Sequence, residues 1–184
     1  MKDRRLYLSL GTNLGDRLDN LERAIVQLVQ ELGDLCQLSA VYESEAWGYQ
    51  SSHAFYNCCL ALDTDLSPLE SLDRLEAIER GMGRTVKADS PHGADTIPAA
   101  YQDRIIDLDL LFYGKREIDH PRLKLPHPAI EKRRFVLLPL SEIAPRMIHL
   151  PSQQTISQLL ERCEDGSRVF AARESWSAEI RKLL

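Results

Sequence analysis

The sequence contains few of the features that mark membrane, disulfide-stabilised or nucleic-acid-coating proteins. No apolar run among its 184 residues approaches the roughly 20 residues that span a bilayer. The four cysteines form no C-x-x-C pair, which favours small buried hydrophobes in a reducing compartment over zinc or redox motifs. The formal net charge is −5, without the basic excess that binding to nucleic-acid phosphates requires. We therefore expect a cytoplasmic protein that binds neither membranes nor nucleic acids.

The composition indicates a globular chain with a substantial core. Hydrophobic residues make up 43% and charged residues 28% of the sequence, which excludes disorder of the whole chain. This length is typical of one domain, which can bury roughly 70% of its unfolded surface without cross-links. We expect a single domain over 1–184, with a core over 5–150 and a helical C-terminal extension over 151–184.

Hydrophobic periodicity predicts two helices separated by strands. The first helix, over 16–32, repeats leucine and isoleucine at helical spacing and is followed by Gly33 at the C-cap position. The second, over 68–81, begins with a serine cap at Ser67, a proline at the first helical position and a glutamate three residues after the cap. Strands are expected at 5–10, 35–42, 55–63 and 105–112.

The order of these elements is strand, helix, strand, strand, helix, strand. It predicts an α+β, ferredoxin-like βαββαβ core, in which an antiparallel or mixed sheet carries its helices on one face. Residues 43–53 and 84–103 are expected to be loops, and the second is long enough to suggest a functional role. The remaining expectations are a strand at 122–125, a short helix at 128–132, an apolar stretch at 135–140 broken by Pro139, and helices at 154–162 and 174–184.

The strongest local signal is Asp107-Leu108-Asp109 in the last predicted strand of the core. Alternation along the strand turns the apolar side chains to one face: Ile106, Leu108, Leu110 and Phe112. The two carboxylates then lie on the other face, about 7 Å apart, where they can share divalent cations. Oxygen ligands without nearby cysteine or histidine suit Mg²⁺ held together with substrate phosphates. The alternative is the solvated face of an edge strand.

Cationic side chains follow the second helix and surround this strand. They are Arg84, Lys87, Arg104, Arg122, His127, Lys132, Arg133 and Arg134. Convergence of such donors with a metal would bind phosphate groups, whereas the alternative is a solvated basic face. The segment Gly11-Thr12-Asn13-Leu14-Gly15 lacks the lysine and the spacing of a phosphate-binding loop and is interpreted as a turn before the first helix.

A third signal is Phe55-Tyr56-Asn57. Alternation places Phe55 and Asn57 on one face of a strand, where an aromatic ring beside an amide can hold a flat heterocycle with polar edges. Phe135 is a candidate for the opposite side of such a ligand. The alternative is that these aromatic residues belong to the core.

Together these motifs resemble the 6-hydroxymethyl-7,8-dihydropterin pyrophosphokinase family, from Tyr7 to about Pro145. The order and spacing of five segments carry the resemblance. They are Ser9-Leu10-Gly11-Thr12-Asn13-Leu14-Gly15, Phe55-Tyr56-Asn57, Arg104-Ile105-Ile106-Asp107-Leu108-Asp109, Leu125-Pro126-His127-Pro128 and Arg133-Arg134-Phe135-Val136-Leu137.

The resemblance implies transfer of a pyrophosphoryl group from ATP to the hydroxymethyl group of the pterin, with release of AMP in folate biosynthesis. The implied cofactors are two Mg²⁺ ions, and the implied partners are only the two small substrates, bound by a monomer. The implied catalytic residues are Arg84, Arg104, Asp107 and Asp109, the two aspartates being the metal ligands. The implied ATP-binding residues are Glu79, Lys87, Tyr101, Arg104, Arg122, His127 and Arg133, with no role for Leu110. The implied pterin-binding residues are Ser44, Ala46, Trp47, Phe55, Asn57 and Phe135.

The chain departs from the family pattern in three places. The pterin loop reads Ser44-Glu45-Ala46-Trp47-Gly48 without its usual threonine and prolines, and Val86 replaces a second arginine of the catalytic loop. That loop has an insertion of about ten residues, a length that loops tolerate at small entropic cost, and it ends in Tyr101-Gln102-Asp103-Arg104 in place of Trp-Gly-Pro-Arg. These departures motivate one alternative, a catalytically weak or inactive pterin- or nucleotide-binding relative. A nucleic-acid-binding α+β domain is the second alternative.

Overall fold

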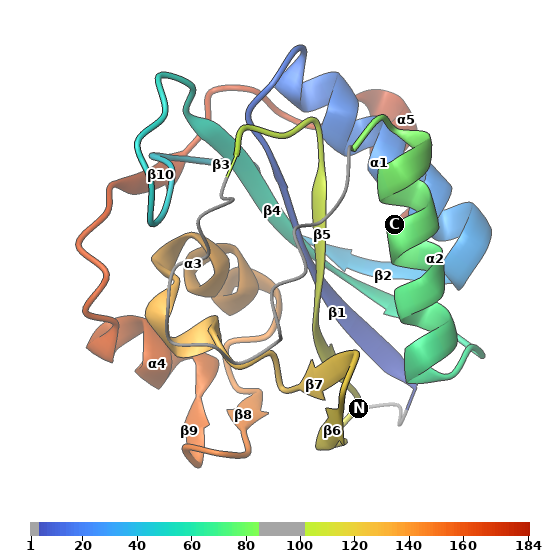
Figure 1. Ribbon diagram of the computed structural model, residues 1–184, viewed down its shortest axis with the longest axis vertical. Helices are drawn as coiled ribbons and strands as arrows, with labels where there is room; N and C mark the ends of the chain where they lie inside the picture. The colour runs from blue at the N-terminus through green and yellow to red at the C-terminus, as the bar shows by residue number, and fades with distance from the viewer. Residues whose placement is uncertain (1–3, 85–101) are drawn as a thin grey trace.

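A computed structural model describes residues 4–84 and 102–184, and the statements below refer to that part of the chain. Its centre is an antiparallel sheet in the order β10-β3-β4-β1-β5, with β2 also paired to β4 (Figure 1). The strands of this sheet are β1 (Arg5–Thr12), β2 (Asp34–Leu38), β3 (Tyr42–Ser44), β4 (Phe55–Asp63), β5 (Asp107–Tyr113) and β10 (Val169–Ala171). The α+β class and the antiparallel sheet are therefore confirmed.

Two small hairpins and the helices complete the described part of the chain. The hairpins pair β6 (Ile118–His120) with β7 (Leu123–Leu125), and β8 (Ile148–His149) with β9 (Gln154–Thr155). The helices are α1 (Arg17–Leu32), α2 (Pro68–Gly81), α3 (Arg134–Ile143), α4 (Ile156–Arg162), α5 (Ala178–Arg181) and the 3-10 helix Ile130–Lys132. Across the described residues, no helix combines the length and the apolar character that a membrane span needs.

Helices cover both faces of the sheet (Figure 1). On one face, α1 and α2 pack against β1 and β4 through residues such as Leu8, Leu21 and Leu75. On the other face, α3 and α4 form a second apolar cluster, which includes Leu137 of α3 and Tyr7 of β1. The two helices of the predicted core, α1 and α2, share one face as expected. The later helices α3 and α4 cover the other face, because alternate residues of β1 and β4 are apolar on both sides and both sides must be covered.

The two long helices begin and end as predicted because their ends carry local signals. Asp16 caps α1 by accepting from the Asp19 backbone N–H at 3.1 Å. Gly33 ends the helix at φ 141°, and a Cβ there would lie 2.2 Å from the Asp63 carbonyl oxygen. Ser67 and Glu70 form a capping box at the start of α2. Each contact satisfies helix-end groups from within a few residues, so sequence alone identifies it.

The strand expected at 35–42 is two strands, β2 and β3, that both pair with β4. The break lies at Ser39, whose hydroxyl accepts the Cys59 backbone N–H at 2.9 Å. A side chain thus takes the place of a strand carbonyl, and the chain can bend between the two pairings without leaving a buried N–H unpaired.

A register shift in the β1–β5 pairing changes the predicted faces of β5. Leu8 pairs with Leu110, but the next pair along is Tyr7 with Phe112, so one extra residue of β5 is accommodated as a bulge. Phe112 therefore turns to the α3 face, where its ring meets Tyr7 edge-on at 6.4 Å. The expectation that Phe112 shares a face with Leu108 and Leu110 was wrong, whereas Asp107 and Asp109 precede the bulge and keep the predicted alternation.

The second half of the chain departs more from expectation. The apolar stretch at 135–140 lies within helix α3, which retains Pro139 in its interior. The strand at 122–125 is β7, and the segment at 128–132 ends in the 3-10 helix. The tail helices are shorter than predicted, and the extension also contributes β10, which pairs with β3. Burial of Ile180 and a 2.8 Å hydrogen bond from Trp176 Nε1 to the Ser39 carbonyl anchor the tail to the core.

Protonation of a buried histidine is expected to lower stability in mild acid. The His149 ring packs edge-on against Phe112 at 6.2 Å, and its Nδ1 lies 2.9 Å from Ser152 Oγ. Burial lowers the pKa of His149 below its ordinary 6.5, although Glu131 and Glu117 oppose the shift. The unfolded chain thus takes up this proton at a higher pH than the folded chain. The free energy of unfolding should fall as pH drops below 6.5 and level off below the folded pKa.

This expectation is checked by urea unfolding of the wild type and of His149→Gln between about pH 5 and 8. That range extends roughly 1.5 units on either side of the ordinary histidine pKa. The difference in the free energy of unfolding between the two proteins should depend on pH. A constant difference would contradict the assignment.

Candidate active site

Three neighbouring strands place the candidate pterin and metal residues in one row. Gly11 of β1 pairs with Asn57 of β4 on one side and with Asp107 of β5 on the other. Paired residues of antiparallel strands point to the same face, so the amide and the carboxylate flank a glycine that has no side chain. Adjacent strands lie about 4.8 Å apart, which separates the two backbone positions by roughly 10 Å. The row therefore provides a floor with polar groups at both ends.

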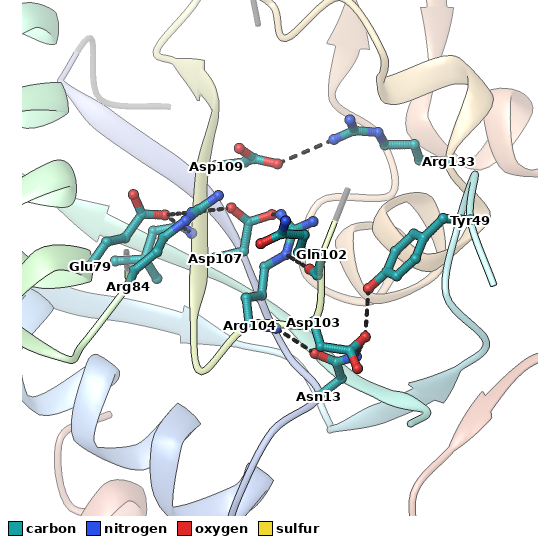
Figure 2. A network of polar contacts seen from close by, with 11 residues as sticks. Asn13, Tyr49, Glu79, Arg84, Gln102, Asp103, Arg104, Asp107, Asp109 and Arg133 are labelled. Atoms are coloured by element: carbon teal, nitrogen blue, oxygen red, sulfur yellow. Dashed lines mark hydrogen bonds and ion pairs between the residues drawn. The ribbon is translucent and has the colours of Figure 1, made fainter. Parts of the chain in front are cut away.

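The two carboxylates of β5 are engaged by arginines from three segments (Figure 2). Asp107 accepts hydrogen bonds from Arg84 and, at 2.8 Å, from Arg104 Nη1. Asp109 accepts from Arg133 Nη1 at 3.2 Å. The side chains of Asp107 and Asp109 remain 23% and 24% exposed, so both are open to a ligand from one side.

Glu79 binds both an arginine of this cluster and the backbone of β5. Its side chain is 2% exposed, contacts Arg84 Nη1 and accepts the Leu108 backbone N–H at 2.7 Å. Burial by itself lowers the pKa of Arg84, but the adjacent carboxylates of Asp107 and Glu79 outweigh it and raise that pKa above its ordinary value. Glu79 thus fixes both the arginine and the strand that carries the two aspartates. Sequence analysis placed it on the nucleotide side without foreseeing this role.

The donor set suits a hard divalent cation that is shared with a phosphorylated substrate. Residues 4–84 and 102–184 contain no cluster of three or more histidine, cysteine or acidic side chains arranged to hold a metal ion. Among the described residues, Asp107 and Asp109 offer carboxylate oxygens on one face of β5, and water or substrate oxygens would complete the coordination of such an ion. This is the usual arrangement for Mg²⁺ at phosphoryl-transfer sites.

The predicted pterin residues on β3 and β4 lie together. Asn57 Nδ2 donates to Ser44 Oγ at 2.9 Å, and both side chains are buried. This bond fixes the orientation of the Asn57 amide, because its NH₂ group is committed to the hydroxyl. Phe55 is half-buried and meets Tyr49 edge-on at 6.5 Å.

A second aromatic group lies at the start of α3. Trp47, next to the half-buried Ala46, and Phe135 have ring centroids 6.4 Å apart. The Arg133 guanidinium carbon lies 5.2 Å from the Trp47 ring centroid and 5.9 Å from that of Phe135. Since Arg133 also binds Asp109, this aromatic group is linked to the carboxylate pair.

The other predicted ATP residues are placed differently. Arg122 is exposed and binds Asp73 at 2.6 Å and Glu76 at 3.3 Å, so it is attached to α2. His127 is held in a turn, where its backbone N–H donates to the Leu111 carbonyl and its Nδ1 accepts from Ala129. Two further predicted ATP residues, Lys87 and Tyr101, lie outside the described residues, as does Val86.

Two residues of this region were missed as candidates by sequence analysis. The buried Asn13 accepts the Arg104 backbone N–H through Oδ1 at 2.7 Å, and its own N–H donates to the Arg104 carbonyl at 3.1 Å. Asp103 accepts hydrogen bonds from several side chains of the loop between β3 and β4. Asn13 follows a glycine turn that was interpreted only as a connection. Asp103 carries no signal, because its partners lie some 50 or more residues away in the chain.

Comparison with known proteins identifies the chemistry of this site. Residues 7–145 match the family model described as 7,8-dihydro-6-hydroxymethylpterin-pyrophosphokinase. The 2-amino-4-hydroxy-6-hydroxymethyldihydropteridine pyrophosphokinase of Porphyromonas gingivalis is 43% identical over 141 residues, which cover 76% of this chain and 90% of that protein. The corresponding protein of Pseudomonas aeruginosa is 36% identical over 161 residues, covering 86% of this chain and 91% of the relative.

Solved structures support the fold at lower sequence identity. A structure described as HPPK-DHPS in complex with substrates has a TM-score of 0.67 and 15% identity, and the match covers 86% of this chain and 43% of that one. Plasmodium falciparum HPPK-DHPS gives a TM-score of 0.66 at 17% identity, with coverage of 86% and 45%. The chain thus spans less than half the length of these longer proteins. The family match includes both carboxylates of β5, Asn57 and the glycine between them, and the chain belongs to the 7,8-dihydro-6-hydroxymethylpterin-pyrophosphokinase family.

Proposed function

We propose that this chain transfers the terminal pyrophosphoryl group of ATP to 6-hydroxymethyl-7,8-dihydropterin. The hydroxymethyl oxygen forms a bond to the β-phosphorus, the bond from that phosphorus to the oxygen bridging the α-phosphate breaks, and AMP leaves while the hydroxyl proton is released. Family membership makes the chain a pyrophosphokinase of folate biosynthesis and does not favour the inactive alternative. The observation that carries the residue assignments is the row Asn57–Gly11–Asp107 across three strands.

Asn57 is assigned to the polar edge of the pterin. Its NH₂ group is held by Ser44, which fixes its carbonyl oxygen beside Gly11, where that oxygen can accept from a donor on the heterocycle. Phe55 lies beside the same glycine and offers a flat apolar surface for the ring. Ala46, Trp47 and Phe135 are assigned to the opposite side of the ligand. Here the orientation of the acceptor hydroxyl toward the phosphates is the main task of the protein, because alignment of reactants lowers the barrier substantially.

Asp107 and Asp109 would hold Mg²⁺, and the family resemblance supports two ions. When bound, Mg²⁺ offsets the charge of the phosphate oxygens and of the departing AMP. Asp109 lies on the same face as Asp107 and is also assigned to accept the proton of the attacking hydroxyl. Arg84, Arg104 and Arg133 already lie on these carboxylates with their side chains mostly buried. Guanidinium groups also bind phosphate oxygens through charge-assisted hydrogen bonds, so these arginines are assigned to the polyphosphate chain.

The nucleotide is assigned to the α2 side of the cluster. Glu79 lies in that helix and Arg122 is hydrogen-bonded to it, whereas His127 lies in the turn that leads toward α3. Lys87 and Tyr101 stay in the assignment on the family resemblance alone.

We also propose that β1-α1-β2/β3-β4-α2-β5 is a ferredoxin-like core, which the strand order β3-β4-β1-β5 supports. The proposed domain is the whole chain, with residues 151–184 as an extension of that core.

The reaction is tested with purified protein, Mg²⁺, ATP and 6-hydroxymethyl-7,8-dihydropterin. AMP should form only when the pterin is present, in equal amount to the diphosphorylated product. ADP in place of AMP would mean transfer of a single phosphoryl group and would overturn the proposal. Saturable pterin binding without nucleotide turnover would instead support the inactive relative.

Filling the space at Gly11 is expected to weaken pterin binding. A Cβ at this position would lie 3.3 Å from Asn57 Oδ1 and 3.8 Å from Phe55 Cδ1. In Gly11→Ala the Asn57 amide has to shift by a few tenths of an ångström, and the new methyl group enters the floor of the site. We expect the KM for the pterin to rise about tenfold, the result of losing roughly 1.4 kcal/mol of binding, with little change in the KM for ATP. A larger effect on ATP than on the pterin would contradict the placement of the ring.

A further inference from the structure

One carboxylate outside the metal-binding pair accepts four side-chain hydrogen bonds. Asp103 Oδ1 lies 2.6 Å from Ser51 Oγ, 2.7 Å from Asn13 Nδ2 and 3.1 Å from Tyr49 Oη. Asp103 Oδ2 lies 3.1 Å from His53 Nδ1. The Asp103 side chain is still 29% exposed, so these contacts are made at the rim of the site. An ionised carboxylate offers about four acceptor sites, so side chains of the protein alone can fill those of Asp103.

The four donors come from two separate segments of the chain. Tyr49, Ser51 and His53 belong to the loop between β3 and β4, residues 45–54, which also carries Trp47. Asn13 belongs to the turn after β1. Figure 2 shows Tyr49 and Asn13 approaching Asp103 from opposite sides, with Arg104 next to it in the chain. The carboxylate therefore joins loop 45–54 to the strand β1 and to the segment that leads into β5.

Asp103 is directly attached to a proposed catalytic residue. Asn13 holds the backbone of Arg104 through two hydrogen bonds, and the same Asn13 donates to Asp103. The Arg104 side chain then reaches Asp107 at 2.8 Å. Any shift of Asp103 is transmitted through one peptide unit to this arginine, while its other contacts fix the loop beside Phe55 and Trp47.

We propose that Asp103 is a positioning residue that fastens the pterin-side loop 45–54 to the backbone of Arg104 on the phosphate side. The two halves of the site are then ordered together before the substrates bind. This inference rests on the proposed function for its catalytic consequence, but the fastening itself is a property of the protein alone. The hydroxyl of Ser51, followed by Asn13, His53 and Tyr49, lowers the pKa of Asp103, which keeps the carboxylate ionised and accepting at neutral pH.

The first test compares Asp103→Ala with Asp103→Asn and with a control, Asp65→Ala. Asp65 is an acid with a 97% exposed side chain that contacts Arg4 at the opposite end of β4 from this loop. In Asp103→Ala the pterin has to order loop 45–54 on binding, so its KM should rise about tenfold while kcat changes less. Asparagine keeps one oxygen acceptor and should restore part of the loss. Asp65→Ala should match the wild type.

Hydrogen exchange of the ligand-free protein gives a readout that does not depend on turnover. Backbone amides in loop 45–54 should exchange at least about tenfold faster in Asp103→Ala, because a local opening reaction loses its restraint. Amides in α1 should be unaffected. If the wild type forms no AMP yet the exchange result holds, the proposed function fails and the fastening stands. Unchanged exchange in loop 45–54 together with an unchanged pterin KM would overturn the inference.

A double-mutant cycle of Ser51→Ala and Asp103→Ala tests the link itself. If the two side chains act through their mutual hydrogen bond, the double variant should raise the pterin KM little more than Asp103→Ala alone. Independent, additive effects would show that Asp103 acts on the site without the loop and would overturn the proposed link.

Discussion

AMP formation should fall by about a thousandfold when Asp109 is replaced by alanine, the loss typical of a charged group that stabilises the transition state. The Asp109 carboxylate lies on the same face as Asp107, and the proposed function assigns to it a share in holding Mg²⁺ and the removal of the hydroxyl proton. Removing it also leaves Arg133, which binds it at 3.2 Å, without this acceptor. Because the effect is on charge in the transition state, kcat should fall far more than the KM for either substrate rises.

The variant Asp109→Asn separates charge from shape. It keeps the size of the side chain and one oxygen, so thermal unfolding should stay close to the wild type while AMP formation remains severely reduced. Asp65→Ala serves as the matched control for loss of an acid, and it should retain full activity. AMP formation within tenfold of the wild type in both Asp109 variants would show that this carboxylate is dispensable, and the metal assignment would be wrong.

A loss of about 3 kcal/mol in the free energy of unfolding is expected for Glu79→Ala, which is the lower range for breaking a buried ion pair. Glu79 is 2% exposed and serves two buried partners, the Leu108 N–H and the Arg84 guanidinium. Alanine leaves the N–H unsatisfied and removes one of the two carboxylates that contact the arginine. Arg84 keeps its contact with Asp107, so the cost stays below that of a fully isolated charge.

Glu79→Gln distinguishes the two contributions, since it keeps an oxygen for the Leu108 N–H but carries no charge. Its loss in urea unfolding should be clearly smaller than that of alanine, and its activity should fall because Arg84 is then held mainly by Asp107. The control Glu31→Ala breaks an exposed pair with Arg74 and should cost less than about 1 kcal/mol. Equal stability of the Glu79→Ala variant and the wild type would exclude this structural role.

Local signals explain which parts of the fold could be predicted. The cap at Asp16 and the capping box of α2 each depend on contacts within a few residues, and both helices begin where they are expected. Gly33 follows the last turn of α1 as expected, although the carbonyl of the distant Asp63 also leaves no room for a side chain there. The strand β4 also has its predicted bounds, Phe55–Asp63. The order of elements and the alternation of Asp107 and Asp109 follow from period-two and helical patterns in the same way.

The bulge in β5 shows what a local pattern cannot supply. A single strand contains no information about which residue its neighbour skips, so the turning of Phe112 to the other face follows only from the pairing with β1. The strand β10 escaped prediction for a related reason, because three residues become a strand here only by pairing with β3. Pro139 lies inside α3 although proline disfavours helix interiors, and the apolar cluster that α3 completes outweighs that local cost.

In the candidate site too, residue identities could be predicted from the sequence, whereas contacts between distant segments could not. The family can be predicted from residue types alone, because the carboxylate pair, the arginines, and the aromatic and amide residues lie in short segments of matching order and spacing. How these groups are held follows from the fold, which brings Asn57 and Asp107 to either side of Gly11, Glu79 against Arg84, and Asp103 between two loops. The physical reason is that residue types fix what a side chain can bind, whereas its partners come from distant segments that strand register brings together.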